Sequence, residues 1–386
     1  MFPKPPPSRS SRPSRLSRSS RSSRPLPSDS PWMTRALALA RRGEGLTRPN
    51  PPVGAVIVKD GRCIGTGWHR RAGGPHAEVY ALRQAGEAAR GATLYVTLEP
   101  CSTYGRTPPC CDAILRSGIA RVVAAMPDPN PAHAGRGFTL LRKAGVSVTV
   151  GPCRTEAERL LAPFATHQLL HRPYVTLKLA TTLDGRIADS SRRSKWITSA
   201  AARDHVQSLR RASDVIWVGA GTLRADNPSL LPRPPRGRAP WRLVTALEHP
   251  VPLDAQLFTD ASSARTILAA PRGWHPDQAD ALRARGITVW DDLPRTPARF
   301  LPALLTRLGT LGALRVLCEG GGHLASALVR AGLVDELLLI LAPKLLGGPV
   351  GAMGPTAWPI ARAPLFTLQE TLPLPPDLLL RYTPAP

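Results

Sequence analysis

One short stretch, His76-Ala77-Glu78, constrains this chain most, together with Cys101 and Cys110 further along. An imidazole and two thiolates are good Zn²⁺ ligands, and three protein ligands leave a fourth position for a water. Zinc lowers the pKa of that water, and a neighbouring carboxylate can then transfer protons. In nucleobase deaminases the pattern H-x-E…P-C-x-x-C distributes these roles. The predicted metal ligands are His76, Cys101 and Cys110. Glu78 is the predicted catalytic acid and base, and iron is the alternative metal.

The spacing of the two cysteines is unusual, because eight residues separate Cys101 from Cys110 where the common pattern has two. The alternative interpretation makes both cysteines small buried thiols and His76 an ordinary residue at a helix start. We favour the metal site because Glu99-Pro100 precedes the first cysteine and Pro109 precedes the second, at an expected helix start.

Length and composition favour a two-domain enzyme of a reducing compartment. The chain has 386 residues, of which 42% are hydrophobic, enough for two packed cores. An uninterrupted apolar run of about 18 residues is missing, so we expect no transmembrane helix and no membrane partner. Six cysteines spread over the chain argue against a secreted disulfide scaffold and for a cytoplasmic protein.

The net charge of +24 is the main argument for a nucleic-acid partner. However, residues 1–30 carry six arginines and one lysine against one aspartate, and the remaining arginines are spread along the chain. We therefore favour solvated charge and small phosphate-bearing ligands over a polynucleotide, and expect no nucleic-acid partner.

Residues 1–28 consist mainly of Ser, Arg and Pro, and we expect a disordered tail. Their composition resembles an organellar transit peptide. We favour a tail without a targeting role, or a start codon placed upstream of the true one.

Alternating strand-like and helix-like segments predict a three-layer α/β/α sandwich over residues 31–152. Within it, Lys59-Asp60-Gly61-Arg62 predicts a hairpin turn. A bridging helix is expected within residues 153–172, and a second α/β domain over residues 173–386, after the tail of residues 1–30.

The clearest motif of the second domain is Glu319-Gly320-Gly321-Gly322-His323, between an expected strand and an expected helix. Backbone N–H groups at such a turn bind phosphates well. A tight turn without a ligand is an equally good interpretation, and the motif is not the G-x-G-x-x-G of a Rossmann fold.

Taken together, the motifs of both halves resemble the bifunctional riboflavin-biosynthesis enzymes, in which a pyrimidine deaminase is fused to a reductase. The matching stretches are Thr47–Gly54, Pro75–Glu78, Thr97–Ser102, Gly105–Cys110, Lys195–Thr198, Ala225–Pro228 and Ala342–Gly347. The family inserts the loop before Cys110, which accounts for the long cysteine spacing.

The resemblance implies a cytidine-deaminase-like sandwich followed by a dihydrofolate-reductase-like α/β domain. The first would be a zinc-dependent hydrolase that removes the 2-amino group of a diaminopyrimidinone ribosyl 5′-phosphate. The second would use NADPH to reduce the ribosyl group to a ribityl chain. Family members associate through the reductase domain, so the resemblance also implies a homo-oligomer.

The resemblance also implies ligand-binding residues in the reductase. Those expected to contact NADPH are Ala180, Trp196, Thr222, Asp226, Gly321, Gly322, His323, Leu324, Ala325, Ser326 and Ala327. Those expected to contact the substrate are Ser194, Arg210, Leu230, Arg233 and Glu319. Arg210 and Arg233 suit its phosphate. Lys178 is a candidate partner of the sugar, or equally an inward strand lysine paired with a carboxylate.

Two positions depart from the family pattern. Thr103 stands where the family usually has His, and Ala246-Leu247 stands where it has Asp-Ser. The second change removes a candidate hydrogen bond to the cofactor, so a deaminase with an impaired reductase is one alternative. Two others are a nucleic-acid-editing deaminase and a non-catalytic interaction protein with a structural zinc.

Overall fold

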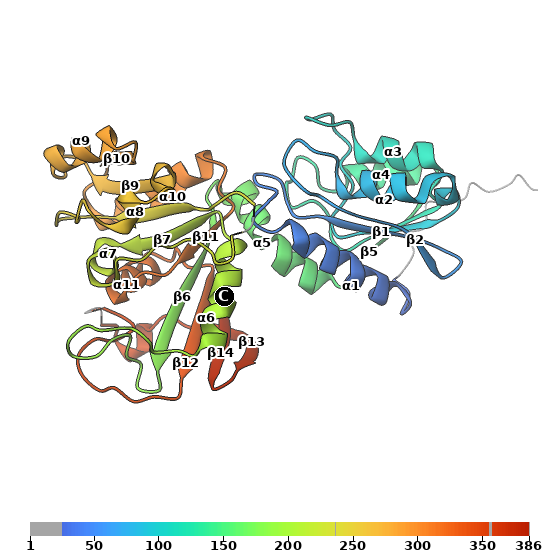
Figure 1. The fold of residues 1–386 in the computed structure, drawn as a ribbon. Coiled ribbons are helices and arrows are strands. Elements are labelled where there is room, and N and C mark those ends of the chain that lie inside the picture. Colours follow the sequence, from blue (N-terminus) through green and yellow to red (C-terminus); the bar gives the residue numbers. More distant parts are fainter. Residues whose placement is uncertain (1–24, 236, 355–356, 386) are drawn as a thin grey trace, which may run out of the picture.

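The computed structural model describes residues 25–235, 237–354 and 357–385, which form two lobes with helix α5 (Arg154–Leu170) between them (Figure 1). Most of the expected disordered tail lies outside the described residues. The first helix, α1, begins at Asp29, two residues before the expected start of the folded region. The buried Asp29 carboxylate accounts for this start, because Arg121 donates two hydrogen bonds to it at 2.9 and 2.8 Å.

The first sheet has five strands in the order β2-β1-β3-β4-β5. They are β1 (Gly54–Lys59), β2 (Arg62–Trp68), β3 (Thr93–Val96), β4 (Arg121–Ala124) and β5 (Ser147–Val150). Strand β1 is antiparallel to both neighbours, whereas β3, β4 and β5 are parallel. The predicted hairpin turn is confirmed, since Asp60 and Gly61 connect β1 to β2 with φ angles of 50° and 70°.

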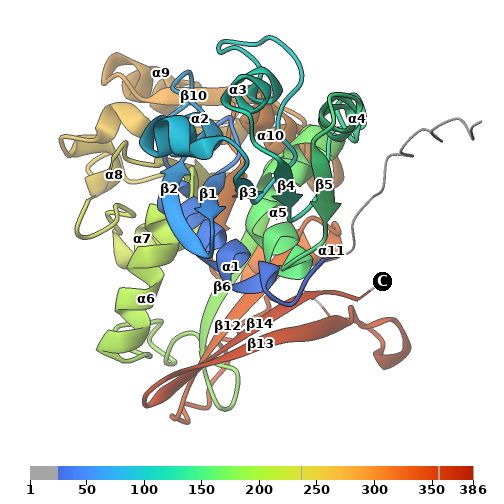
Figure 2. The same ribbon diagram turned by 90° about the vertical axis from the view of Figure 1, so that its right-hand side faces the viewer.

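Helices cover both faces of this sheet, as Figure 2 shows. On one face lie α2 (Ala77–Ala85), α3 (Cys110–Ser117) and α4 (Arg136–Lys143), and on the other α1 (Asp29–Ala40) and α5. Short 3-10 helices follow α1 (η1, Arg41–Gly43) and α2 (η2, Gly86–Ala89). Successive strand side chains point to opposite faces, so Ile57 packs with α2 and Val56 with α1. The predicted three-layer sandwich is confirmed.

The second sheet has nine strands in the order β10-β9-β8-β7-β11-β6-β12-β14-β13. They are β6 (Tyr174–Thr182), β7 (Val215–Gly219), β8 (Trp241–Thr245), β9 (Thr266–Pro271), β10 (Thr288–Leu293), β11 (Arg315–Cys318), β12 (Glu336–Ala342), β13 (Phe366–Leu374) and β14 (Asp377–Pro384). The strands from β10 to β12 are parallel, and β14 and β13 continue the sheet antiparallel.

Two layers of helices enclose this sheet. The helices are α6 (Ala200–Arg211), α7 (Ala220–Asp226), α8 (Gln256–Thr259), α9 (Pro276–Ala284), α10 (Pro297–Thr310) and α11 (Gly322–Arg330), with 3-10 turns η3 (Ser263–Arg265) and η4 (Ile360–Arg362). Helices α10 and α11 pack on the face that presents Trp217, whereas α7, α8 and α9 pack on the face that presents Ile216. The predicted second α/β domain is confirmed.

Strand β13 was not predicted, although its apolar residues recur in alternation. It pairs with β14 in a register that shifts between Leu368 and Glu370. In the sequence the alternation of Phe366, Leu368, Leu372 and Leu374 is interrupted by Glu370, so it does not form the continuous apolar pattern that identifies a strand. Most of its residues are exposed, as expected for a strand at the sheet edge.

The two lobes contact each other through a buried ion pair. Arg48, in the loop before β1, donates from Nη1 to Asp214 Oδ1 at 3.2 Å and to the Asp214 carbonyl oxygen at 3.1 Å. The other oxygen of Asp214 accepts the N–H groups of Leu314 and Arg315. Gly45 permits close approach, because a Cβ there would lie 2.1 Å from the Arg211 carbonyl oxygen. The first lobe is thereby fixed to the base of strands β7 and β11.

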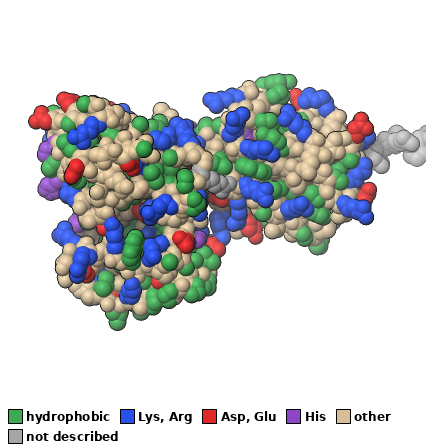
Figure 3. All heavy atoms as spheres, viewed as in Figure 1, with side chains coloured by type: hydrophobic (Ala, Val, Ile, Leu, Met, Phe, Trp, Pro, Cys, Tyr) green, Lys and Arg blue, Asp and Glu red, His purple; other side chains and the backbone are tan. Residues whose placement is uncertain are grey.

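The positive charge is scattered, as expected from the sequence. Figure 3 shows Lys and Arg side chains spread over both lobes on the face in view. Among the residues that the structure describes, no helix has the length and apolarity to cross a membrane.

We predict that Arg48→Ala lowers the free energy of unfolding by about 3 kcal/mol, because it leaves the buried Asp214 carboxylate without its cation. Denaturant unfolding followed by circular dichroism measures this loss. Arg154→Ala is the matched control, since its ion pair with Glu158 is exposed and should change stability by less than about 1 kcal/mol. Equal losses in the two variants would contradict a stabilising role for the contact between the lobes.

Candidate metal centre and reductase site

Three separate segments bring the predicted metal ligands together. His76 is the residue before the first turn of α2, Cys110 is the first residue of α3, and Cys101 lies in the loop after β3. One ligand atom from each lies within 4.8 Å of the other two. The imidazole Nδ1 faces the sulfurs, 3.2 Å from Cys110 Sγ and 3.5 Å from Cys101 Sγ.

The charges in this cluster suit a cation. A hydrogen bond from the Cys110 thiol and a smaller contribution from His76 together lower the pKa of Cys101 to about 4, although burial opposes both. The same hydrogen bond raises the pKa of Cys110. These shifts favour the thiolate form of Cys101, whose sulfur also accepts the Cys110 backbone N–H at 3.2 Å. A thiolate, a second thiol and an imidazole are the donors that zinc prefers.

Glu78 lies beside the cluster, in the first turn of α2. Its side chain is only 3% exposed, and Oε2 has no hydrogen-bond partner among the described residues. Burial raises the pKa of this carboxyl, although the charge on His76 opposes the shift. An unpartnered, buried carboxyl oxygen beside three convergent ligands fits a zinc site with a proton-transfer group.

Two residues of this site were not predicted as functional from the sequence. His69 is buried, and its ring lies edge-on to that of His76 with centroids 5.3 Å apart. Its Nδ1 lies 3.0 Å from the Pro75 carbonyl oxygen, and its Nε2 lies 3.1 Å from Asn50 Nδ2. Since a carbonyl can only accept, Nδ1 carries the proton and Nε2 accepts from the amide. Asn50 lies within the matching stretch Thr47–Gly54, which was the signal available for it, whereas His69 lies in none of the matching stretches.

A third residue, Glu99, holds the loops around the cluster. Its carboxylate accepts backbone N–H groups from Asp128, Gly135, Gly137 and Phe138 at 2.8–3.2 Å. These bonds tie the start of α4 to the segment that carries Cys101. The sequence signal was its position immediately before Pro100 and Cys101, but its partners lie 29 to 39 residues further along the chain.

The predicted reductase residues lie around the carboxyl ends of three adjacent strands, β7, β11 and β6. Thr222 follows β7 in α7, Glu319 follows β11, and Ala180 lies near the end of β6. Ligands in open parallel sheets bind outside these ends. The Thr222 hydroxyl oxygen accepts the Gly321 N–H at 3.1 Å, so α7 is joined directly to the Gly-rich turn.

A buried charge cluster forms the centre of this region. Arg210 donates from Nε and Nη2 to the two oxygens of Glu319 at 2.7 and 3.0 Å. Burial would raise the pKa of Glu319, but Arg210 and then Lys178 hold it below its ordinary value. Burial in turn lowers the pKa of Lys178, although Glu319 opposes the shift. The structure therefore gives Arg210 a carboxylate partner within the protein, in addition to its predicted phosphate contact.

The other predicted contacts differ in how accessible they are. Trp196 is 61% exposed, with the Arg203 guanidinium 4.4 Å from its ring centroid, and Arg233 is exposed. Leu230 and Ala325 are buried. Ser326 is buried too, and its hydroxyl donates to the Gly322 carbonyl oxygen. The roles assigned to these side chains stay predictions, as do those of Gly322, His323, Leu324 and Ala327.

Comparison with known proteins identifies the family. The cytidine and deoxycytidylate deaminase zinc-binding region matches residues 27–126, and the RibD C-terminal domain matches residues 173–380. The riboflavin biosynthesis protein RibD of Escherichia coli is 43% identical over 91% of this chain and 98% of its own length. This chain belongs to the RibD family. The RibD of Aquifex aeolicus is likewise 43% identical, over 83% of this chain and 88% of its own length.

Solved RibD-family structures have the same fold. That of Acinetobacter baumannii RibD matches with a TM-score of 0.82 and 40% identity, covering 93% of this chain and 99% of that one. That of the Thermotoga maritima diaminohydroxyphosphoribosylaminopyrimidine deaminase/5-amino-6-(5-phosphoribosylamino)uracil reductase matches with a TM-score of 0.81 and 34% identity, covering 92% of this chain and 99% of that one.

These findings confirm the expected deaminase and reductase halves of a bifunctional RibD-family enzyme of riboflavin biosynthesis, with zinc and NADPH as cofactors. They do not test the individual site residues or the domain boundaries. Thr103 is exposed, Ala246 is buried, and Leu247 is 45% exposed at the end of β8. The effect of these departures on activity therefore stays a prediction.

We predict that Cys110→Ser abolishes stoichiometric zinc binding, because it replaces a thiolate ligand with a poorly coordinating hydroxyl. Elemental analysis of the purified variant measures the zinc content. Cys111→Ser is the matched control, since the adjacent Cys111 thiol points away from the cluster toward the Pro100 and Gly137 carbonyl oxygens. Full zinc occupancy in the Cys110 variant, or its loss in the control alone, would contradict the ligand assignment.

Proposed function

We propose that the first lobe deaminates a diaminopyrimidinone ribosyl 5′-phosphate at the His76–Cys101–Cys110 cluster, and that the second lobe reduces the sugar of the product. The observation that carries this proposal is the convergence of three candidate zinc ligands beside the unpartnered Oε2 of Glu78 in a RibD-family chain. Bound zinc would lower the pKa of a water at the site.

Glu78 is the proposed proton carrier of the hydrolysis. Its unpartnered Oε2 would accept a proton from the attacking water and return it to the leaving amino group, so that ammonia departs as a neutral molecule. The raised pKa of Glu78 suits this exchange, because it makes the carboxylate a better acceptor of the proton from water. His69 and Asn50 would orient the pyrimidine, since the His69 ring lies edge-on to that of His76 and Asn50 donates to His69 Nε2.

In the second lobe, NADPH would supply a hydride to the ring-opened sugar. Lys178 is the proposed donor of a hydrogen bond to the sugar oxygen that gains negative charge. Glu319 favours the charged form of Lys178, and Arg210 holds Glu319 in place through two hydrogen bonds. Ser194 is positioned by its hydrogen bond to Asp226, at 2.9 Å.

We also propose a cytoplasmic homo-oligomer that associates through the second lobe. Exposed apolar side chains near edge strand β13, among them Leu365 and Leu368, support this arrangement. Light scattering that returned the mass of a single chain would contradict it.

We expect Glu78→Gln to reduce ammonia release about a hundredfold or more, since the amide cannot transfer protons. Zinc content should be unchanged, and the variant should still oxidise NADPH when the deaminated intermediate is supplied. The control is Glu87→Gln, an exposed glutamate after the same helix. Near-normal ammonia release by the Glu78 variant would favour a structural zinc and overturn the proposal.

We expect Lys178→Met to remove most reductase activity and yet raise the free energy of unfolding at neutral pH. Burial lowers the pKa of Lys178 below its ordinary value of 10.5, so its charge opposes folding whenever the unfolded lysine is protonated. The gain in stability should therefore shrink as the pH rises toward that value. Unfolding curves and NADPH oxidation, with exposed Lys143→Met as control, measure both effects.

An unchanged or higher reductase rate would remove Lys178 from the mechanism. A loss of stability at every pH would instead support the alternative of a structural lysine paired with Glu319.

A further inference from the structure

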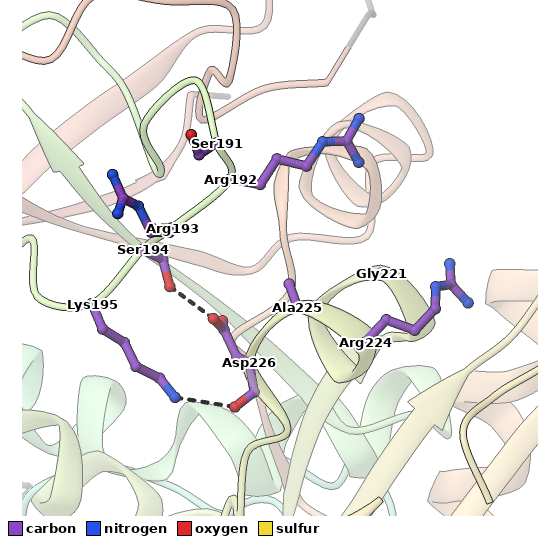
Figure 4. Close-up of a pocket in the computed structure, with 9 residues that line it drawn as sticks. All are labelled: Ser191, Arg192, Arg193, Ser194, Lys195, Gly221, Arg224, Ala225 and Asp226. Atoms are coloured by element: carbon purple, nitrogen blue, oxygen red, sulfur yellow. Dashed lines mark hydrogen bonds between the residues drawn. The ribbon is translucent and has the colours of Figure 1, made fainter.

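A cavity near the reductase site is lined by nine residues, of which only Ser194 and Asp226 have a predicted role. It has a volume of about 530 Å³ and lies between the loop of residues 191–195 and helix α7 (Figure 4). Its lining is Ser191, Arg192, Arg193, Ser194, Lys195, Gly221, Arg224, Ala225 and Asp226. A cavity of this size accommodates a drug-sized or nucleotide-sized group.

Four of these side chains are cations, and Asp226 is the one carboxylate among the lining residues. The cations are not neutralised equally. Arg193 pairs with Asp189 through Nε at 2.9 Å. Lys195 donates to the backbone oxygen of Asp226 at 3.1 Å, and the Asp226 carboxylate accepts the Ser194 hydroxyl instead. The cavity therefore keeps an excess of positive charge.

Arg192 and Arg224 have the least compensated charges. Arg224 donates to the Pro250 carbonyl oxygen at 3.0 Å, which orients its guanidinium without neutralising it. The Arg192 side chain has no hydrogen bond or ion pair with any described residue. In Figure 4 both guanidinium groups extend to the same side of the cavity, one from the loop and one from α7.

The loop is built to present Arg192. Asp189 Oδ1 accepts the N–H groups of both Ser191 and Arg193 at 2.9 Å, and the Asp189 carbonyl oxygen accepts the N–H of Arg192. Arg192 itself has a φ of 61°, a left-handed conformation that is uncommon for a side chain of this size. A fixed turn with a free guanidinium at its tip fits an anion-binding role.

We propose that Arg192 and Arg224 bind a phosphate group of the dinucleotide cofactor. Guanidinium groups match the planar oxygen pairs of phosphates. Two reasons favour the cofactor over the substrate. Helix α7 also carries Thr222, whose hydroxyl accepts a hydrogen bond from the Gly-rich turn. In addition, NADPH carries three phosphate groups, whereas the substrate carries one. The inference rests on the proposed NADPH-dependent function and adds two residues that would recognise a phosphate of that cofactor.

The test is titration of NADPH into the full-length protein without substrate, followed by the change in NADPH fluorescence. We expect Arg192→Ala and Arg224→Ala each to raise the dissociation constant about tenfold, the effect of losing one charge-assisted hydrogen bond. Arg193→Ala is the matched control, because Asp189 already neutralises this side chain, and it should change the constant less than about twofold.

Titration with NADH identifies which phosphate is bound, since NADH lacks the 2′-phosphate. If the variants lose affinity for NADPH alone, Arg192 and Arg224 bind the 2′-phosphate. If they lose affinity equally for NADPH and NADH, the two arginines bind the diphosphate. The proposal is overturned if both variants bind NADPH like the wild type, or if they raise only the KM for the phosphorylated substrate. Failure of the wild type to bind NADPH at all would instead overturn the proposed reductase function, and this inference with it.

Discussion

The carboxylate of Glu99 accepts four backbone N–H groups, and the geometry of the metal centre depends on it. Those bonds fix the segment that ends in Cys101 against the start of α4, where a Cβ on Gly137 would meet the Pro100 carbonyl oxygen at 2.2 Å. With that loop held, the Cys101 sulfur lies within reach of two helix starts that provide His76 and Cys110. Four backbone donors satisfy both oxygens of this buried carboxylate, so one side chain orders a long loop.

Both lobes place their chemistry at the same position of an α/β fold, beyond the carboxyl ends of parallel strands. In the first lobe the ligands follow β3 and begin α2 and α3, and in the second the candidates follow β6, β7 and β11. Backbone N–H groups and helix starts concentrate there, which favours thiolates and phosphates alike. The ion pair of Arg48 and Asp214 joins the lobes at the amino ends of the strands of the second sheet, at the start of β7. That contact can therefore stabilise the assembly without occupying either site.

The parts of this structure that follow from the sequence are those set by local patterns. The Asp60-Gly61 turn, the helix start at Cys110 and the Gly-rich turn before α11 each depend on neighbouring residues, and all were predicted. The contacts of Glu99, His69 and Arg48 were not predicted, because their partners are distant in the chain and no sequence pattern relates the two positions. Strand β13 was missed because Glu370 interrupts its apolar alternation and Pro373 is a residue that strands disfavour. The burial of Ser326 shows a further limit, since motif matching locates a residue without telling which way its side chain points.

The most direct test of the bifunctional account is a time course on the wild-type, zinc-loaded chain with the diaminopyrimidinone ribosyl phosphate as substrate. Ammonia release and NADPH oxidation would be followed together, with and without NADPH. The account predicts that ammonia appears without NADPH, and that NADPH, once added, is consumed until it matches the ammonia already formed. Absence of ammonia from the zinc-loaded protein, or NADPH consumption that does not depend on prior deamination, would contradict it.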